Sequence, residues 1–351
     1  MLLRIGKYLL LLLIFLSSEV DAQLAIRDSS INVTFYGVED GLPNPEVTVI
    51  FRDSFGLIWL GTDGGGVSCF DAHSFFNYYP NRNIADSLSD GYVTCIAEDK
   101  AHNIWVGTQT GVSCLNRHTM KFQNYPIEYA TRNGNYYRGV LAIYFDSYGQ
   151  CWLGSMRGLG RFDTTTGEVE WLDFPFLLNE QHLYLTNKIL EDKKGNLWIL
   201  VSGVLLCWDR MQKEYMRLET SQYETGHTKP KVISGFAFDS KYRLCVSTHN
   251  AIYVYRDGVN LPYVYELPTL DQSNTFRLIE GLWLGYADEL WCLVDNKLYF
   301  VERTTGEWLR IDKIFTRTDQ LGYIPNAACN FEGENVYFFP VEGGFASWSH
   351  G

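Results

Sequence analysis

Residues 53–62 read DSFGLIWLGT, and this stretch decides the fold because it recurs along the chain. Three clear copies follow: DKAHNIWVGT at 99–108, DSYGQCWLGS at 146–155 and DKKGNLWILV at 192–201. Fainter copies centre on Cys245, Trp291 and Tyr337. The key positions of the seven copies lie 46 or 47 residues apart, at 59, 105, 152, 198, 245, 291 and 337. A fixed period of this length indicates a chain built from repeated supersecondary units.

Each copy lies within a unit of four short strands. In the first repeat, β-rich runs occupy residues 47–52, 57–61, 67–70 and 75–79. The Asp-x-x-Gly segment between the first two runs is typical of a hairpin turn, in which Asp caps backbone N–H groups and Gly adopts a left-handed conformation. Short hairpin loops demand antiparallel pairing, which argues against a parallel solenoid, the other fold with such a period. We therefore predict an all-β, seven-bladed β-propeller with four antiparallel strands per blade.

The two ends of the chain are expected to complete one blade together. The last repeat has three candidate strands, at 328–331, 336–339 and 345–348, and no fourth follows them. Residues 31–36 precede the first repeat much as residues 75–79 precede the second. Pairing this amino-terminal strand with the last repeat would close the ring and remove two exposed edges. We therefore predict that residues 23–351 form one propeller domain.

The composition suits an exported globular protein. The chain is 46% hydrophobic and 15% aromatic and contains 31 glycines, a bias that favours short strands and tight turns. Residues 1–22 carry Arg4 and Lys7, then an apolar run at 8–16 and small residues, which is the pattern of a secretory signal peptide. The apolar run is about half of the roughly 20 residues that a membrane helix needs. We expect a periplasmic or secreted protein with no membrane span in this chain.

Charge and metal-binding residue types narrow the range of partners. The net charge is −12, whereas nucleic acid or an anionic bilayer would require a basic face, so we expect no nucleic-acid partner. The eight cysteines leave disulfide bonding open, although Cys69, Cys114 and Cys207 fall at similar repeat positions, which repeat geometry holds apart. The seven histidines show no metal-ligand spacing and no Cys pair has the zinc pattern, so neither a metal nor another cofactor is predicted.

Several runs of the sequence resemble the two-component regulator propeller repeat. They are VEDGLPN at 38–44, the strand and Asp at 47–53, GLIWLGT at 56–62, Gly66-Val67, Phe70-Asp71 and Phe75. The resemblance spans the mature chain, is strong in the first four repeats and fades in the last three. It implies the periplasmic sensor region of Bacteroidetes hybrid two-component systems. Such regions usually pair two seven-bladed propellers, detect breakdown products of polysaccharides and signal through a membrane helix to a cytoplasmic kinase.

The resemblance implies a sensor, and two forms of it stay open. The chain shows no second propeller, membrane helix or kinase His motif, so it is either the amino-terminal part of a longer sensor or a truncated relative that works as a secreted binding protein. We expect an oligosaccharide ligand, with a second propeller, other downstream sensor domains or a second copy of the chain as alternative protein partners. The competing functions are a secreted polysaccharide-degrading enzyme, glycosidase or lyase, and a protein-binding scaffold.

No catalytic residue is predicted, and we expect the chain not to be an enzyme. Glu39 and Asp40 are adjacent carboxylates, but neighbours in sequence project apart instead of flanking a glycosidic bond. A large aromatic residue in the second strand of a blade is expected to pack between neighbouring blades. A structural role, not sugar stacking, is therefore assigned to Trp59, Trp105, Trp152, Trp198 and Trp291.

Propellers bind ligands where loops converge around the central channel. The loops that join the fourth strand of one blade to the next blade include residues 81–90, 128–138 and 220–231, and the second-to-third-strand loops include 63, 109, 156–157 and 249–250. Residues 131–138 mix aromatic rings with planar donors, as a sugar or acidic-sugar site would. The candidate ligand-binding residues are Asp63, Arg82, Asn133, Tyr136, Tyr137, Arg138, Arg157 and His249.

Overall fold

The computed structural model describes most of the chain from residue 31 onward. The described residues are 31–130, 136–172, 174, 185–218, 232–256, 262–268, 279–285, 288–294, 297–310, 329–331, 334–341 and 344–350. The predicted signal peptide, residues 1–22, and the candidate site residue Asn133 lie outside the described residues.

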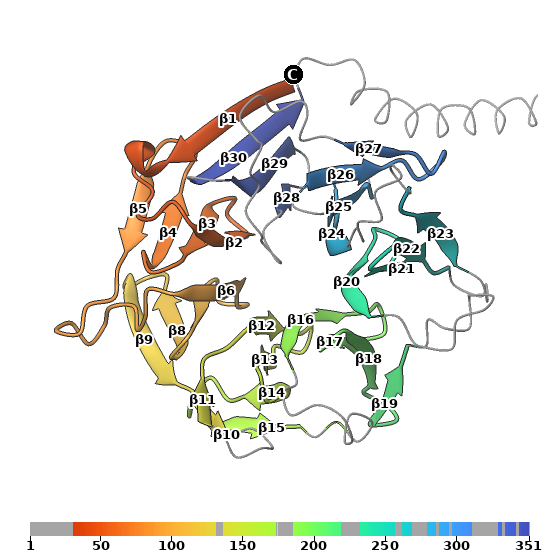
Figure 1. Ribbon diagram of the computed structural model, residues 1–351. Coiled ribbons are helices and arrows are strands. Elements are labelled where there is room, and N and C mark those ends of the chain that lie inside the picture. The colour runs from red at the N-terminus through yellow and green to blue at the C-terminus, as the bar shows by residue number, and fades with distance from the viewer. Residues whose placement is uncertain are drawn as a thin grey trace, which may run out of the picture.

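The strands form antiparallel four-stranded sheets arranged in a ring (Figure 1). Six blades each consist of four consecutive strands. Blade 1 consists of β2 (Val47–Arg52), β3 (Ile58–Thr62), β4 (Val67–Phe70) and β5 (Phe75–Tyr78). Blade 2 consists of β6 (Val93–Glu98), β7 (Ile104–Thr108), β8 (Gly111–Asn116) and β9 (Lys121–Pro126). Blade 3 consists of β12 (Ala142–Phe145), β13 (Cys151–Gly154), β14 (Leu159–Phe162) and β15 (Val169–Trp171). Blade 4 consists of β16 (Thr186–Glu191), β17 (Leu197–Val201), β18 (Val204–Asp209) and β19 (Glu214–Arg217). Blade 5 consists of β20 (Ile233–Phe238), β21 (Leu244–Thr248), β22 (Ala251–Val254) and β23 (Tyr263–Glu266). Blade 6 consists of β24 (Ile279–Leu284), β25 (Leu290–Val294), β26 (Lys297–Val301) and β27 (Trp308–Arg310).

The remaining four-stranded sheet combines the two ends of the described chain. It contains β28 (Cys329–Phe331), β29 (Glu334–Val341), β30 (Gly344–His350) and β1 (Ile31–Gly37), in the order β1-β30-β29-β28. Antiparallel pairing runs from Ile31 opposite His350 to Gly37 opposite Gly344. Four antiparallel strands per blade and closure by the amino-terminal strand are therefore confirmed. The predicted count of seven is corrected in one respect: six blades are contiguous in sequence, and seven is reached only when this composite sheet is counted as a blade.

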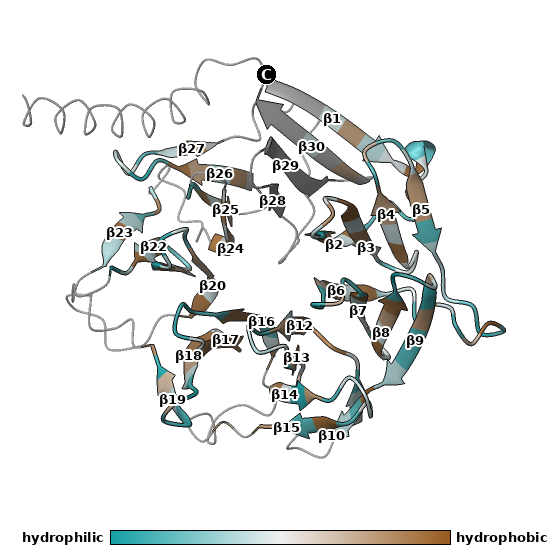
Figure 2. Ribbon diagram, turned by 180° about the vertical axis from the view of Figure 1, so that it is seen from behind, coloured by the Kyte–Doolittle hydropathy of each residue, from teal (hydrophilic) through white to brown (hydrophobic). Residues whose placement is uncertain are grey.

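The first strand of each blade lies nearest the ring axis and the fourth lies outermost (Figure 1). First strands of neighbouring blades contact one another, as β2 does with β6 and β6 with β12. Figure 2 shows hydrophobic residues on the inner strands and hydrophilic residues on outer strands such as β9 and β19. Every residue is buried in five of the second strands, which carry key positions of the repeat: β3, β7, β13, β21 and β25.

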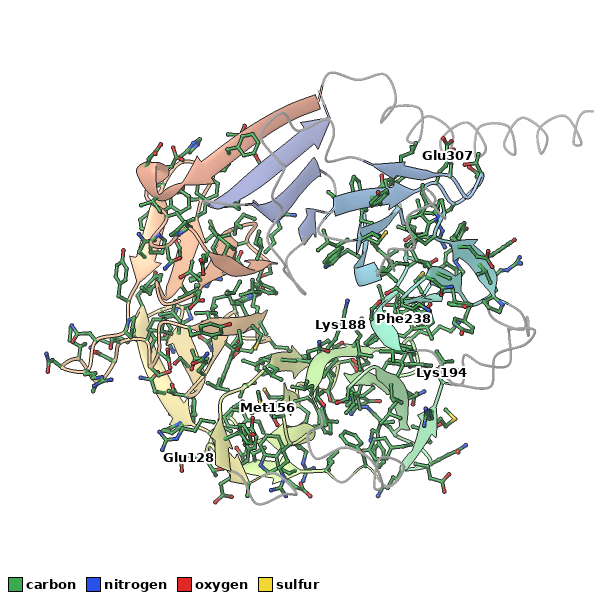
Figure 3. The ribbon with its side chains drawn as sticks, viewed as in Figure 1. Glu128, Met156, Lys188, Lys194, Phe238 and Glu307 are labelled. Atoms are coloured by element: carbon green, nitrogen blue, oxygen red, sulfur yellow. The ribbon has the colours of Figure 1, made fainter. Side chains whose placement is uncertain are left out.

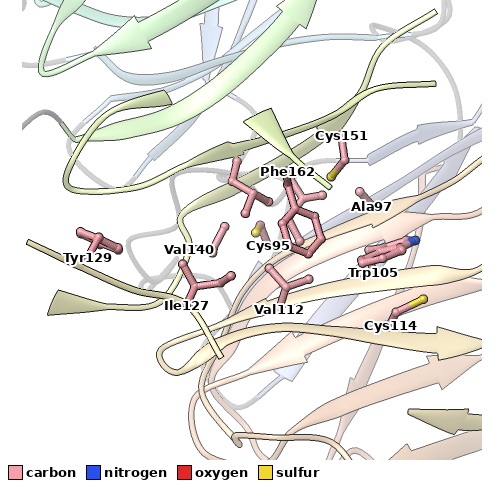
Figure 4. Close-up of a cluster of buried hydrophobic side chains, with 12 residues drawn as sticks. Cys95, Ala97, Trp105, Val112, Cys114, Ile127, Tyr129, Val140, Cys151 and Phe162 are labelled. Carbon is pink, nitrogen blue, oxygen red and sulfur yellow. The ribbon is translucent and has the colours of Figure 1, made fainter. Parts of the chain in front are cut away.

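The core lies between blades. Figure 4 shows the cluster between blades 2 and 3, where Trp105 of β7 meets Phe162 of β14 edge to face with ring centroids 6.0 Å apart. Trp59 packs in the same way against blade 2, and Trp152 packs against blade 4. Because each blade buries one face on its neighbour, the ring must close for the end blades to be covered. The described cysteines are buried and unpaired: Cys69, Cys95, Cys114, Cys151, Cys207, Cys245 and Cys292.

In blades 1 to 4 the Asp of the repeat turn joins the hairpin to the Trp that follows it. Asp146 Oδ1 accepts hydrogen bonds from the backbone N–H groups of Tyr148 and Gln150, and its Oδ2 accepts one of 2.7 Å from Trp152 Nε1. Gly149, with φ of 84°, occupies the left-handed position that lets the chain turn back. Asp53 and Asp99 make equivalent contacts in blades 1 and 2.

In every second blade this Asp also binds an arginine from the following blade. Arg117 reaches Asp53 at 2.6 Å, Arg210 reaches Asp146 at 2.5 Å and Arg303 reaches Asp239 at 3.1 Å, in each case 64 residues along the chain. A serine after the Asp adds a second link, since Ser54, Ser147 and Ser240 donate to Glu98, Glu191 and Asp288 of the next blade. In blades 2 and 4 the turn Asp instead accepts a hydrogen bond from an asparagine of the same blade: Asn103 donates to Asp99, and Asn196 donates to Asp192. The blades are thus linked in pairs: 1 with 2, 3 with 4, and 5 with 6.

Acid is expected to remove part of this stabilisation. Burial by itself raises the pKa of Asp146, but the hydrogen bonds from Trp152 and Arg210 outweigh burial and hold the pKa below its ordinary value of 3.8. Such a carboxylate stabilises the fold above the unfolded-state pKa, and this contribution is lost as pH falls through the folded-state pKa. Urea unfolding of wild type and Asp146→Asn measured from neutral pH to about pH 3 should show a steeper acid loss in wild type. Equal slopes would contradict the assignment.

Candidate functional site

One face of the ring is built from the loops that join second to third strands. In four places a carbonyl at the end of a second strand or in the loop after it accepts a hydrogen bond from a residue at or just before the start of the next blade's innermost strand. The backbone N–H groups of Val140, Thr186, Ile233 and Ile279 donate to the carbonyls of Thr108, Ser155, Gly203 and His249 at 2.8–3.1 Å. These bonds hold the loops near the ends of the innermost strands and hence around the ring axis.

Three of the predicted site residues lie in these loops, each in a different blade. Asp63 follows β3; its N–H donates to the Glu46 carbonyl at 2.9 Å and its carbonyl accepts from Asn44 Nδ2 at 2.7 Å. Its side chain is partly exposed. His249 follows β21 and is also partly exposed, and Arg157 lies between β13 and β14. The structure therefore brings Asp63, Arg157 and His249 to one face of the propeller.

Arg157 is occupied by structural contacts. Its Nη1 donates to the Ala130 carbonyl at 3.1 Å, and its guanidinium lies 5.8 Å from the ring centroid of Trp171. Its backbone N–H binds Ser155 Oγ at 3.0 Å. These contacts fasten a hairpin to blade 3, so Arg157 contributes to the shape of the face more than to a free binding surface.

That hairpin differs from the expected loop at the channel. Residues 128–138 include β10 (Glu128–Ala130) and β11 (Tyr136–Arg138), which form a two-stranded sheet beside the outermost strand β15 (Figures 1 and 2). Tyr129 is buried against Trp171, with ring centroids 5.1 Å apart, and this aromatic contact draws the segment outward. The expectation that this segment surrounds the axis is corrected for its described residues: β10 and β11 lie on the outer edge of the ring.

The remaining candidates are spread around that outer edge. Tyr137 packs against the cluster between blades 2 and 3, Arg138 forms an exposed ion pair with Glu128, and only the backbone of Tyr136 is described. Arg82 is exposed in the connection between β5 and β6. That connection is anchored by Leu88 in the core and by a 2.7 Å ion pair between Asp86 and Lys121 of β9, and it extends away from the ring in Figure 1. Arg82, Tyr137 and Arg138 therefore do not join the three residues of the loop face.

Sequence reasoning missed Lys188, which lies on the innermost strand β16. Figure 3 shows its side chain reaching toward the centre of the ring. Its Nζ lies 5.7 Å from the ring centroid of Phe236 on β20, and burial lowers the pKa of Lys188 to about 8. The signal was present in the repeat: the position ten residues before each key position is otherwise Val49, Cys95, Ala142, Gly235, Gly281 and Ala327. Lys188 is the charged member of an otherwise small and uncharged set.

Metal-binding clusters and membrane-spanning helices are absent from the described part of the chain. Among those residues, no group of three or more His, Cys, Asp or Glu side chains is arranged to hold a metal ion. No helix of the described chain has the length and apolar character needed to span a membrane.

Comparison with known families identifies the repeat. The family model of the two component regulator propeller matches residues 41–64 and 87–110, which cover the first two strands and the Asp turn in blade 1 and the same elements in blade 2. Two stretches of the chain match the two-component regulator propeller repeat. The resemblance inferred from the sequence is thereby confirmed. No curated protein matches the sequence.

Solved structures that resemble this chain include extracellular domains of putative regulatory systems and a lyase. The extracellular domain of a putative one component system from B. thetaiotaomicron is 18% identical with a TM-score of 0.69, and the match covers 91% of this chain and 43% of that chain. The extracellular domain of a putative hybrid two component system from the same organism is 18% identical with a TM-score of 0.64, covering 92% and 42%. Virginiamycin B lyase from Staphylococcus aureus is 12% identical with a TM-score of 0.65, covering 91% and 99%.

At these identities the similarity shows the fold alone. This chain spans less than half of the two extracellular domains. It spans nearly the whole lyase, but propeller folds host unrelated activities, so the shared fold does not carry the lyase chemistry over.

Proposed function

We propose that this chain is the extracytoplasmic ligand-sensing propeller of a hybrid two-component sensor and that it recognises an oligosaccharide without chemically altering it. The observation that carries this proposal is the pair of regulator propeller matches at 41–64 and 87–110. Similarity to extracellular domains of two-component systems supports it, since the fold extends over more than nine-tenths of this chain. A signal peptide at 1–22 would deliver the domain to the compartment where such ligands occur.

The loop face suits recognition better than catalysis. Asp63 and His249 are partly exposed polar side chains on loops fixed by backbone hydrogen bonds to rigid strands. Such a scaffold presents hydrogen-bonding groups at fixed positions with little ordering on binding, which suits a hydroxyl-rich ligand such as a sugar. The hypothesis of a polysaccharide-degrading enzyme would need a carboxylate pair or an activated nucleophile on this face, and Asp63 alone supplies neither.

Binding and turnover separate these functions. We expect the purified protein from residue 23 onward to bind members of an oligosaccharide panel in titration calorimetry and to leave them intact in chromatography of the same mixtures. A double substitution, Asp63→Ala with His249→Ala, should weaken binding, whereas Arg82→Ala on the outer edge should not. Cleavage of any oligosaccharide would favour the enzyme, and failure to bind any of the panel would overturn the sensor proposal.

A further inference from the structure

No residue of the described chain supplies a counter-charge to Lys188. It is partly exposed toward the ring axis, and its Nζ makes no ion pair and no hydrogen bond to another described residue. The ammonium instead faces the Phe236 ring, and Phe236 itself is fully buried. An ammonium in such surroundings loses much of its hydration without a compensating partner.

The register of the sheets shows that the fold does not need a lysine there. Lys188 pairs with Leu200 of β17, two residues after the key Trp198. The same place is held by Val49 opposite Gly61 and by Cys95 opposite Gly107, and both of these side chains are buried against the next blade. In blades 5 and 6 it is held by Gly235 and Gly281. A small apolar residue therefore suffices to pack this position, and a lysine adds a charge that the packing does not use.

A β-bulge places a second donor beside Lys188. The pairing of β16 with β17 shifts between Thr186 and Lys188, which leaves Asn187 as the extra residue. The equivalent bulge residue Thr48 turns toward the next blade and donates to the Val93 carbonyl at 2.6 Å. Asn187 is exposed and its side chain makes no hydrogen bond to a described residue. Asn187 and Lys188 thus follow each other along the strand, and neither side chain has an acceptor among the described residues.

We propose that Lys188 and Asn187 form an anion-binding subsite facing the ring axis, where the ammonium binds a carboxylate or sulfate group of the ligand. Resting on the proposed function, this inference narrows the ligand to an acidic oligosaccharide. A charge-assisted hydrogen bond from Lys188 would replace the missing counter-charge, and Asn187 would bind a neighbouring hydroxyl or the same anionic group. Neutral sugars would leave the ammonium unpaired and would gain nothing from it.

The subsite can be tested on the whole protein with simple probes. The lysines are reductively methylated with ¹³C-formaldehyde, and the Lys188 signal is assigned by its loss in Lys188→Met. Sodium glucuronate and sodium sulfate are then titrated, with glucose and sodium chloride as controls. We expect glucuronate or sulfate to shift the Lys188 signal while glucose leaves it in place. A response to glucuronate alone assigns the carboxylate and a response to sulfate alone assigns the sulfate group. No shift with either anion, or an equal shift with glucose, overturns the subsite.

Matched variants link the subsite to oligosaccharide binding. Lys188→Met should weaken binding of a uronate-containing oligosaccharide about tenfold or more, as expected for one charge-assisted contact, whereas Lys194→Met, an exposed lysine of the same blade, should not. Lys188→Met should also unfold at a higher urea concentration than wild type, because it removes an unpaired cation. A lower urea midpoint overturns the inference. If only neutral oligosaccharides bind, and bind the variants equally, the sensor proposal stands and the anion subsite falls.

Discussion

Removing residues 1–37 should abolish cooperative unfolding of this protein, whereas removing residues 1–30 should leave it intact. The longer deletion takes away β1, whose seven residues all pair with β30. It also removes Tyr36, which stacks on Phe345 at 5.0 Å and contacts Phe70 of blade 1 at 4.8 Å. Loss of one large aromatic side chain from a core costs about 3–5 kcal/mol, and the lost strand pairing adds to this. The sum is comparable to the whole stability of a typical domain, about 5–15 kcal/mol.

The exposed edge of β30 gives a second measurable effect. An unpaired edge strand is a template for association, so the shorter protein should elute as aggregates in size-exclusion chromatography. Circular dichroism during urea unfolding reports cooperativity for both deletions. Tyr36→Ala in the full chain isolates the side-chain part and should keep a cooperative but weaker transition. A monomeric 38–351 protein with the wild-type midpoint would show that closure by β1 does not stabilise the ring.

The second large effect is expected at the contact between blades 3 and 4. Arg210→Met should lower the free energy of unfolding by about 3 kcal/mol, because it leaves the carboxylate of Asp146 buried without its cation. The Asp146 side chain has no exposed surface, and Arg210 retains 21% exposure. The same substitution at Arg161, whose ion pair with Glu170 is more than half exposed on both sides, should change stability by less than about 0.5 kcal/mol.

Urea titrations of the two variants give this comparison directly. A double-mutant cycle with Asp146→Asn then isolates the pair, and the coupling energy should account for most of the Arg210→Met loss. Similar losses for Arg210→Met and Arg161→Met would mean that the link between blades 3 and 4 is no stronger than a surface ion pair.

Sequence reasoning misplaced or missed several residues of the candidate site for identifiable reasons. The segment 128–138 looks like a polar ligand loop, but its position depends on Tyr129 finding Trp171, a residue from the far strand of the next blade. In the sequence Arg157 looks like a free cation, but in the structure its guanidinium donates a hydrogen bond to the Ala130 carbonyl of the β10–β11 hairpin. Lys188 was detectable from the repeat alignment, because the register of the repeat puts a small residue at that place elsewhere. The alignment cannot show, however, that no described acidic side chain pairs with Lys188.

The amino-acid sequence alone determined the period, the four antiparallel strands of each blade and the return of residues 31–36 to the last repeat, because these follow from local turn chemistry and from the need to leave no edge unpaired. Only the tertiary structure decided which blades are linked in pairs, which loops lie near the axis and which cation is left without a partner. Those properties depend on side chains from different blades meeting in space, such as Arg210 with Asp146, and pairings of that kind are set by how the blades pack and not by any single stretch of chain.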